Sequence, residues 1–185
     1  EISCSLVGSE MCIRDSLQTD AIIISSCLGV VWVGLIGTYK MIVNSVSGYV
    51  NLIFNSVISS FGNLIATESR EKQFQLFLVY RFFAIWVYGF SAVGFFLLLS
   101  PLVELYVGAD RVLATSIVAW YLTDYFFKGE RVVLSNFKTA AGVFEQDKYL
   151  SILQGIVNLV LSIALVFQIG LAGVFIGTVV SGLIA

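Results

Sequence analysis

The chain has 185 residues, of which 58% are hydrophobic and 12% are charged, and its mean hydropathy is +0.96. Soluble domains carry about 25% charged residues, so this composition predicts a membrane protein. The formal net charge of −2 is too small to indicate a nucleic-acid partner. The sequence has no histidine, and its three cysteines lack a metal-binding spacing. We therefore expect no enzymatic activity, no metal and no cofactor.

Residues 1–16 differ from the rest of the chain because they contain no apolar run and no helical or alternating period. Within them, LVGSEMCIRD at residues 6–15 closely resembles the translation of a transposon-type sequencing adapter. We expect residues 1–16 to be a non-native, disordered segment. The alternative is a native disordered or amphipathic N-terminus. Residues 17–185 are assigned to one transmembrane helical bundle, and we expect them to be a fragment of a longer protein because both ends lie inside apolar segments.

Residues 17–28 are predicted to be the end of a first span, and glycines at positions 29, 34 and 37 then allow the chain to reverse. Asp20 would lie ~13 Å below the membrane edge, at ~1.5 Å per helical residue. A carboxylate at that depth is often functional, so Asp20 is a candidate for ion coupling. The alternative is that Asp20 lies at a helix end or is neutralised by a partner such as Lys40.

Residues 39–63 are predicted to be a single span with a polar stripe along one face. The stripe follows steps of three or four residues through Lys40, Asn44, Ser47, Asn51, Asn55, Ser59 and Gly62. Such a face must point at other helices or into a water-filled cavity. We assign the asparagines and serines of this stripe to a substrate cavity. The alternative is that they only hydrogen-bond to neighbouring helices.

A third span is predicted at residues 82–99, after a charged connection, and Pro101 is expected to end it. The fourth span begins near Val112 and carries polar residues on one face. These are Asp124, Lys128, Arg131, Ser135 and Lys138, again at steps of three or four. This helix is expected to leave the membrane and to break around Gly142.

Residues 150–185 contain no charge over 36 residues. A helix of that length would measure ~54 Å, which exceeds the ~30 Å hydrocarbon core, so we predict two spans with a break at residues 168–173. Gln154 and Asn158 are added to the candidate cavity because they form a shorter polar line. The prediction is an all-α, polytopic protein with about six transmembrane segments, the first and last truncated. Most basic residues fall on one side of the membrane, which places the connections at 68–72 and 138–148 in the cytoplasm.

Several sequence segments are similar to segments of a known family. They are TDAIIISSCLG with VGLIGTY, FNSVISSFGNLIATES, RFFAIWVYGF with PLVELYVG, and KTAAGVFEQDKY before GLAGVFIGT. In order and spacing, these patches resemble polysaccharide flippases of the multidrug, oligosaccharidyl-lipid and polysaccharide exporter superfamily. The resemblance covers nearly all of residues 17–185 and implies the partial C-terminal lobe of a transporter built from two bundles.

The resemblance implies transport of an undecaprenyl-pyrophosphate-linked oligosaccharide from the inner to the outer leaflet of a bacterial plasma membrane. Transport would proceed by alternating access and serve cell-surface polysaccharide biosynthesis, such as that of lipopolysaccharide. The implied partners are the lipid-linked oligosaccharide, membrane lipids, and a glycan polymerase or glycosyltransferases of the same pathway. Asparagine and serine suit sugar hydroxyls, whereas Lys128 and Arg131 suit the pyrophosphate and are expected near the cytoplasmic mouth. The alternative is that both cations only anchor the helix against anionic lipid.

Two other functions stay open. A cation-coupled multidrug exporter of the same superfamily would need acidic residues in an apolar cavity, which Asp20 and Asp124 would supply, although Asp124 is also placed to pair with Lys128. A membrane-embedded glycan polymerase or glycosyltransferase would need a carboxylate or histidine base on a sizeable outer loop. The predicted outer connections are short and contain no histidine, and the amide-rich and cationic faces favour the sugar-lipid.

Overall fold

The computed structural model describes residues 21–108, 112–141 and 145–184, and all regular elements in these ranges are α-helices. Residues 21–27 form a short first helix. The later helices are α2 (Val30–Asn55), α3 (Ile58–Thr67), α4 (Arg70–Val107), α5 (Thr115–Ala141), α6 (Glu145–Ile169) and α7 (Leu171–Ile184). The predicted all-α class is confirmed for the described residues. The adapter-like residues 1–16, Asp20 and the break expected near Gly142 lie outside them.

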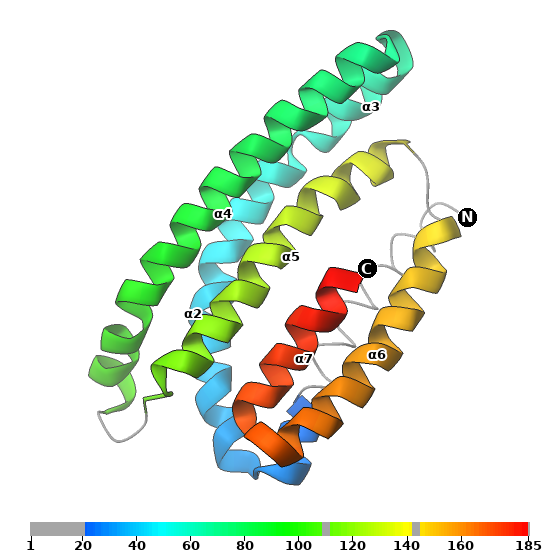
Figure 1. The fold of residues 1–185 in the computed structure, drawn as a ribbon. Coiled ribbons are helices and arrows are strands. Elements are labelled where there is room, and N and C mark those ends of the chain that lie inside the picture. Colours follow the sequence, from blue (N-terminus) through cyan, green and yellow to red (C-terminus); the bar gives the residue numbers. More distant parts are fainter. Residues whose placement is uncertain (1–20, 109–111, 142–144, 185) are drawn as a thin grey trace.

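Successive long helices run in opposite directions, and α7 lies between α5 and α6 (Figure 1). α3 continues in the direction of α2, α4 returns beside them, and α5 runs back along α4. α6 and α7 form a hairpin, of which α7 packs against α5. Because α5 contacts α2, α3, α4 and α7, it is the central helix of the bundle.

The turn before α2 is made by Leu28 and Gly29. Gly29 has a positive φ of 99°, which glycine adopts without steric cost, and α2 begins at the next residue. The prediction that Gly34 and Gly37 also take part in the reversal is wrong, because both lie inside α2. Lys40 is therefore ~15 Å inside the helix at ~1.5 Å per residue, and not near its start.

The predicted single helix over residues 39–63 is interrupted at Ser56 and Val57, between α2 and α3. At this break the Phe54 carbonyl accepts hydrogen bonds from the Tyr80 hydroxyl at 2.7 Å and from Asn136 Nδ2 at 3.3 Å. These donors come from α4 and α5, so neighbouring helices satisfy a carbonyl at the point where the regular pattern of α2 is lost. The sequence-based prediction failed here because both donors are distant in sequence.

Pro101 does not end α4, contrary to the prediction. The helix continues to Val107 and stops at Gly108, whose φ is 103°. A proline removes one helical hydrogen bond and introduces a clash, but packing can offset this cost. Leu99 and Val103, on either side of Pro101, are 1% and 0% exposed, so this part of α4 is fixed by its neighbours.

The predicted break at residues 168–173 is confirmed. α6 ends at Ile169, Gly170 adopts a φ of 70°, and α7 begins at Leu171. Gly173 lets α7 approach α6 closely, since a Cβ at this position would lie 2.4 Å from the Leu165 carbonyl oxygen. The hairpin thus depends on glycine both for its turn and for its packing.

Two stretches of the described residues, Val30–Leu64 and Arg70–Val107, are long and apolar enough to cross a membrane, judged by length and composition. Leu153–Ile169 and Leu171–Leu183 are also apolar but shorter. The helical class and two helices of membrane-spanning length are thus observed, whereas the count of about six spans stays a prediction.

Candidate functional site

A cavity of about 300 Å³ lies where the first helix, α2 and α5 meet. Most of its lining is apolar or aromatic, with four polar or charged residues among it. The lining consists of Ala21, Ile24, Val33, Ile36, Gly37, Lys40, Val43, Asn44, Tyr121, Asp124, Tyr125 and Lys128. On α2 the polar pair is Lys40 and Asn44, and on α5 it is Asp124 and Lys128, each four residues apart. Each helix therefore presents one turn of its polar stripe to the cavity.

Asp124 and Lys128 form an ion pair at the cavity wall. Lys128 Nζ lies 2.6 Å from Asp124 Oδ2, and the Asp124 side chain is 9% exposed. A buried carboxylate is costly unless it is paired, so Lys128 stabilises the charged form of Asp124 at this position. The expected pairing of these two residues is confirmed. Lys40 lies on the opposite wall, so the charged residues of the described lining are Lys40, Asp124 and Lys128.

The part of the α2 stripe beyond Asn44 does not line this cavity. Ser47 Oγ donates to the Val43 carbonyl at 2.6 Å, within its own helix. Asn51 Oδ1 accepts a hydrogen bond from the Tyr88 hydroxyl at 2.5 Å, and Asn55 Oδ1 accepts one from Asn136 Nδ2 at 3.2 Å. These contacts match the alternative in which the asparagines connect helices.

Two other predicted site residues cannot be placed in the same way. The side chain of Ser59 and the whole of Asp20 lie outside the described residues. Asp20 directly precedes Ala21, which lines the cavity. The ion-coupling role proposed for Asp20 therefore stays a prediction.

A second polar cluster joins α5 to the α6–α7 hairpin. Arg131 Nη1 donates to Gln154 Oε1 at 3.2 Å, and its Nη2 is buried without a hydrogen-bond partner among the described residues. A Cβ added to Gly182 would lie 3.1 Å from that Nη2, so α7 passes very close to the guanidinium. On α6, Ser162 Oγ donates to Asn158 Oδ1 at 2.8 Å, and both side chains are buried. Gln154, Asn158 and Arg131 thus belong to this cluster and not to the cavity.

The cavity also contains residues that the sequence analysis did not assign to the site. Lys40 was recognised as the first member of the stripe but not as a lining residue, although its spacing of four from Asn44 puts both on one face. Tyr121 and Tyr125 were missed because aromatic residues in an apolar helix are usually packing residues. Their spacing of four, interleaved with Asp124 and Lys128, indicates the same face.

The chemistry available here is recognition by charge, hydrogen bonding and aromatic contact. The lysines bind anionic oxygens, Asn44 both donates and accepts hydrogen bonds, and the two tyrosines offer ring faces. No group of three or more metal-binding side chains occurs in the described part of the chain. No family model, curated protein or solved structure matches the chain, so its function has to be inferred from its own residues.

Proposed function

We propose that the chain forms one bundle of a bacterial inner-membrane transporter with about six spans in residues 17–185. Its substrate would be an undecaprenyl-pyrophosphate-linked oligosaccharide, moved from the inner to the outer leaflet by alternating access for cell-surface polysaccharide synthesis. The single observation that carries this proposal is the cavity with Lys40, Asn44, Asp124 and Lys128 on its walls. The resemblance of the sequence patches to polysaccharide flippases supplies the substrate class.

The membrane location is supported by the apolar surface of the two longest stretches. Only 11% of the apolar window in Val30–Leu64 and 17% of that in Arg70–Val107 is buried within the bundle, whereas the core helix of a soluble protein is mostly buried. On α4, Trp86, Phe90 and Leu97 are 64%, 79% and 65% exposed. Leaving apolar surface in water costs about 25 cal/mol per Å², so a continuous surface of this kind needs a cover, and lipid provides one.

The position of the cavity along the helices fits a transport site. Lys40 lies ~15 Å from the start of α2, and Lys128 lies ~20 Å from the start of α5, at ~1.5 Å per residue. Both distances place these two lysines within the helices and away from their ends. Lys128 is thus near the middle of α5, and its expected position at the cytoplasmic mouth stays a prediction. Substrate sites of transporters commonly lie near the bilayer midplane, between helices.

The cavity has the chemistry that the head of a sugar-lipid requires. Lys40 and Lys128, the latter also paired with Asp124, can contact phosphate oxygens, while Asn44 can donate to and accept from a sugar hydroxyl. A volume of about 300 Å³ is at the lower end for ligand pockets, which suits a phosphate and one or two sugar units but not a whole lipid. The lipid tail would stay in the bilayer, against the exposed apolar faces of α2 and α4.

The test is to express the protein from its own gene in the bacterium and to measure surface polysaccharide together with lipid-linked oligosaccharide in the inner leaflet. The substitution Lys40→Ala is expected to lower the rate of surface polysaccharide export about tenfold, and lipid-linked precursor should accumulate, with unchanged protein abundance. The matched control is Lys72→Ala, which removes the same charge from an exposed residue paired with Glu68. Normal export by Lys40→Ala and by Asn44→Ala would contradict the proposal.

A cation-coupled multidrug exporter is the second candidate, and it is favoured by the buried Asp124 at the cavity wall. In that case the carboxylate would bind a proton or a metal cation, and Asp124→Asn would abolish drug resistance while surface polysaccharide stayed normal. The two lysines disfavour a cationic substrate in the same cavity. Resistance that depends on the gene, without any change in surface polysaccharide, would decide for the exporter.

A further inference from the structure

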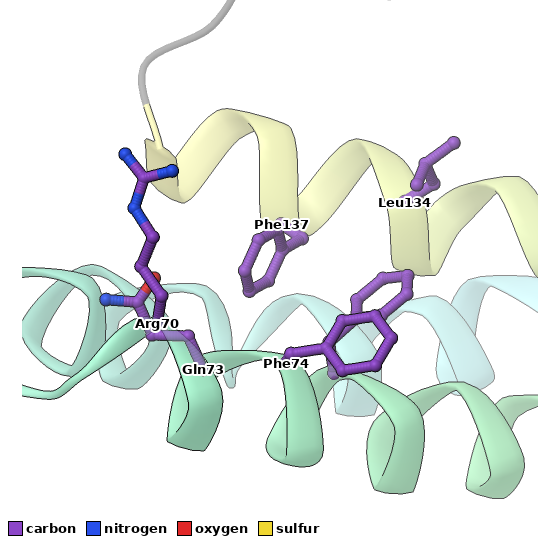
Figure 2. A pocket seen from close by; sticks show the side chains of 6 residues that line it. Arg70, Gln73, Phe74, Leu134 and Phe137 are labelled. Carbon is purple, nitrogen blue, oxygen red and sulfur yellow. The ribbon is translucent and has the colours of Figure 1, made fainter.

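A second depression, larger and more open than the cavity, lies between the beginning of α4 and the end of α5. We call it the α4–α5 groove, and it is lined by Arg70, Gln73, Phe74, Phe77, Leu134 and Phe137. Its volume is about 580 Å³. Figure 2 shows Arg70 at one end of the groove and the aromatic rings and Leu134 along the rest of it. The groove shares no lining residue with the cavity between α2 and α5.

The apolar part of the groove has a packed floor and exposed walls. The rings of Phe77 and Phe137 meet edge to face with centroids 5.2 Å apart, and Phe61 packs against Phe137 from the other side at 5.8 Å. Phe74 and Leu134 rise beside this floor and are 61% and 43% exposed. The groove therefore offers an apolar surface that its own helices leave uncovered.

The polar end of the groove carries a positive charge. Arg70 is the first residue of α4 and its side chain is exposed, and no carboxylate of the described residues forms an ion pair with it. Of the two acidic residues close to it in the sequence, Glu68 is bound by Lys72 at 2.9 Å, and Glu71 is the next residue of α4. Gln73 Nε2 donates to the Glu68 carbonyl at 2.9 Å, which fixes the start of the helix below the guanidinium. The charge of Arg70 is thus available to a ligand that lies in the groove.

We propose that the α4–α5 groove binds an anionic phospholipid, with its phosphate on Arg70 and one acyl chain along Phe74, Phe77, Leu134 and Phe137. The groove has one cationic end and one apolar length. These match the phosphate and the acyl chain of the phospholipid. A guanidinium binds phosphate oxygens through two parallel hydrogen bonds. A soluble anion would use the guanidinium but not the apolar walls.

The inference rests on the membrane location in the proposed function but not on the transported substrate. The start of α4 and the end of α5 lie at the same end of the bundle (Figure 1), which carries Arg70, Lys72 and Lys138 together with Glu68 and Glu71, a small excess of basic residues. Basic ends of spans favour the cytoplasmic side, and the cytoplasmic leaflet is the one with negative surface potential. The groove therefore opens where anionic phospholipid is most abundant.

The experiment measures lipid binding to the purified full chain in nanodiscs and by native mass spectrometry. The probes are phosphatidylglycerol and phosphatidylcholine with identical acyl chains. The chain is expected to prefer phosphatidylglycerol, and Arg70→Ala should lower its affinity for this lipid more than about tenfold, because it removes both the general charge effect and the paired hydrogen bonds to the phosphate. Lys72→Ala is the matched control, since it removes an equal charge two residues away, and it should lower the affinity by no more than about fivefold, the effect of one basic residue near an anionic surface. Leu134→Trp, which fills the groove while Arg70 stays, should reduce binding of both lipids.

Four results would overturn the inference. An equal loss with Arg70→Ala and Lys72→Ala would mean that only the general charge of this end attracts lipid. Competition by millimolar glycerol phosphate as effective as that by the phospholipid would mean that Arg70 binds a free phosphate. Equal binding of the two lipids by the unmodified chain would contradict selectivity. Failure of the chain to enter nanodiscs would overturn the membrane location as well, whereas normal insertion without lipid preference would contradict only the lipid site.

Discussion

The contact between Gly129 and Tyr88 provides the sharpest test of how α4 and α5 pack. Tyr88 is 1% exposed, and a Cβ placed on Gly129 would lie only 2.2 Å from Tyr88 Cγ. Because this atom belongs to the body of the ring and not to a flexible tip, Gly129→Ala cannot be accommodated by a small rotation. The ring also stacks on Phe54 at 5.4 Å and donates a hydrogen bond to Asn51, so its displacement disturbs the contact with α2 as well.

The expected cost of Gly129→Ala can be worked out from these contacts. Overpacking a core typically costs about 1–3 kcal/mol, and loss of the Tyr88–Asn51 hydrogen bond adds about 1 kcal/mol. Within a helix, alanine is more favourable than glycine by about 1 kcal/mol, which offsets part of this destabilisation. We expect the free energy of unfolding to fall by about 1–3 kcal/mol, measured by equilibrium unfolding in mixed micelles.

The control for this prediction is Gly94→Ala on α4, because a Cβ at Gly94 would meet nothing within 4 Å. That variant should be neutral or more stable. In a Tyr88→Ala background, Gly129→Ala should lose its cost, since the ring that it would strike is absent. If Gly129→Ala is as well tolerated as Gly94→Ala in the presence of Tyr88, then Gly129 does not face that ring and the packing of α5 against α4 is different.

Two further predictions concern the polar contacts of the bundle. Tyr80→Phe and Asn136→Ala each remove one donor to the Phe54 carbonyl at the break between α2 and α3. Each should lower the free energy of unfolding by about 1 kcal/mol and speed amide hydrogen exchange near the break. Unchanged exchange in both variants would contradict the role of these donors. Lys128→Met leaves the carboxylate of Asp124 without the lysine it pairs with, and it should lower the free energy of unfolding by about 1–2 kcal/mol. This is below the roughly 3–5 kcal/mol expected when a fully buried pair is broken, because the Lys128 side chain is 37% exposed. Adding Asp124→Asn to Lys128→Met should restore most of that loss in the same unfolding assay, and a double variant less stable than Lys128→Met would show that the two groups are not coupled.

The sequence predicted best those features that depend on neighbouring residues. The break at Gly170 was predicted from glycine chemistry and from the length of an uncharged stretch, and the Asp124–Lys128 pair from a spacing of four. Both are local. The helical class followed from composition and periodicity, which also act within short windows.

Tertiary packing decided the features that the sequence analysis predicted wrongly. Pro101 is a helix breaker by local rules, yet the buried Leu99 and Val103 keep α4 continuous across it. The α2–α3 break has no glycine or proline, and the side-chain donors to its Phe54 carbonyl lie on α4 and α5. Local propensity carries no information about such partners.

The polar stripe of α5 shows that local sequence rules also do not determine which residues share a site. Asp124 and Arg131 are seven residues apart, which puts them within about 20° of each other around α5, so the sequence correctly places them on one face. They are also separated by ~10 Å along the axis, at ~1.5 Å per residue, and over that distance the neighbouring helices change. Asp124 faces the cavity beside α2, whereas Arg131 meets Gln154 of α6 and the backbone of α7 near Gly182. A helical stripe therefore determines the direction in which side chains point, but only the packing of α5 between α2 and the α6–α7 hairpin determines which of them share a site.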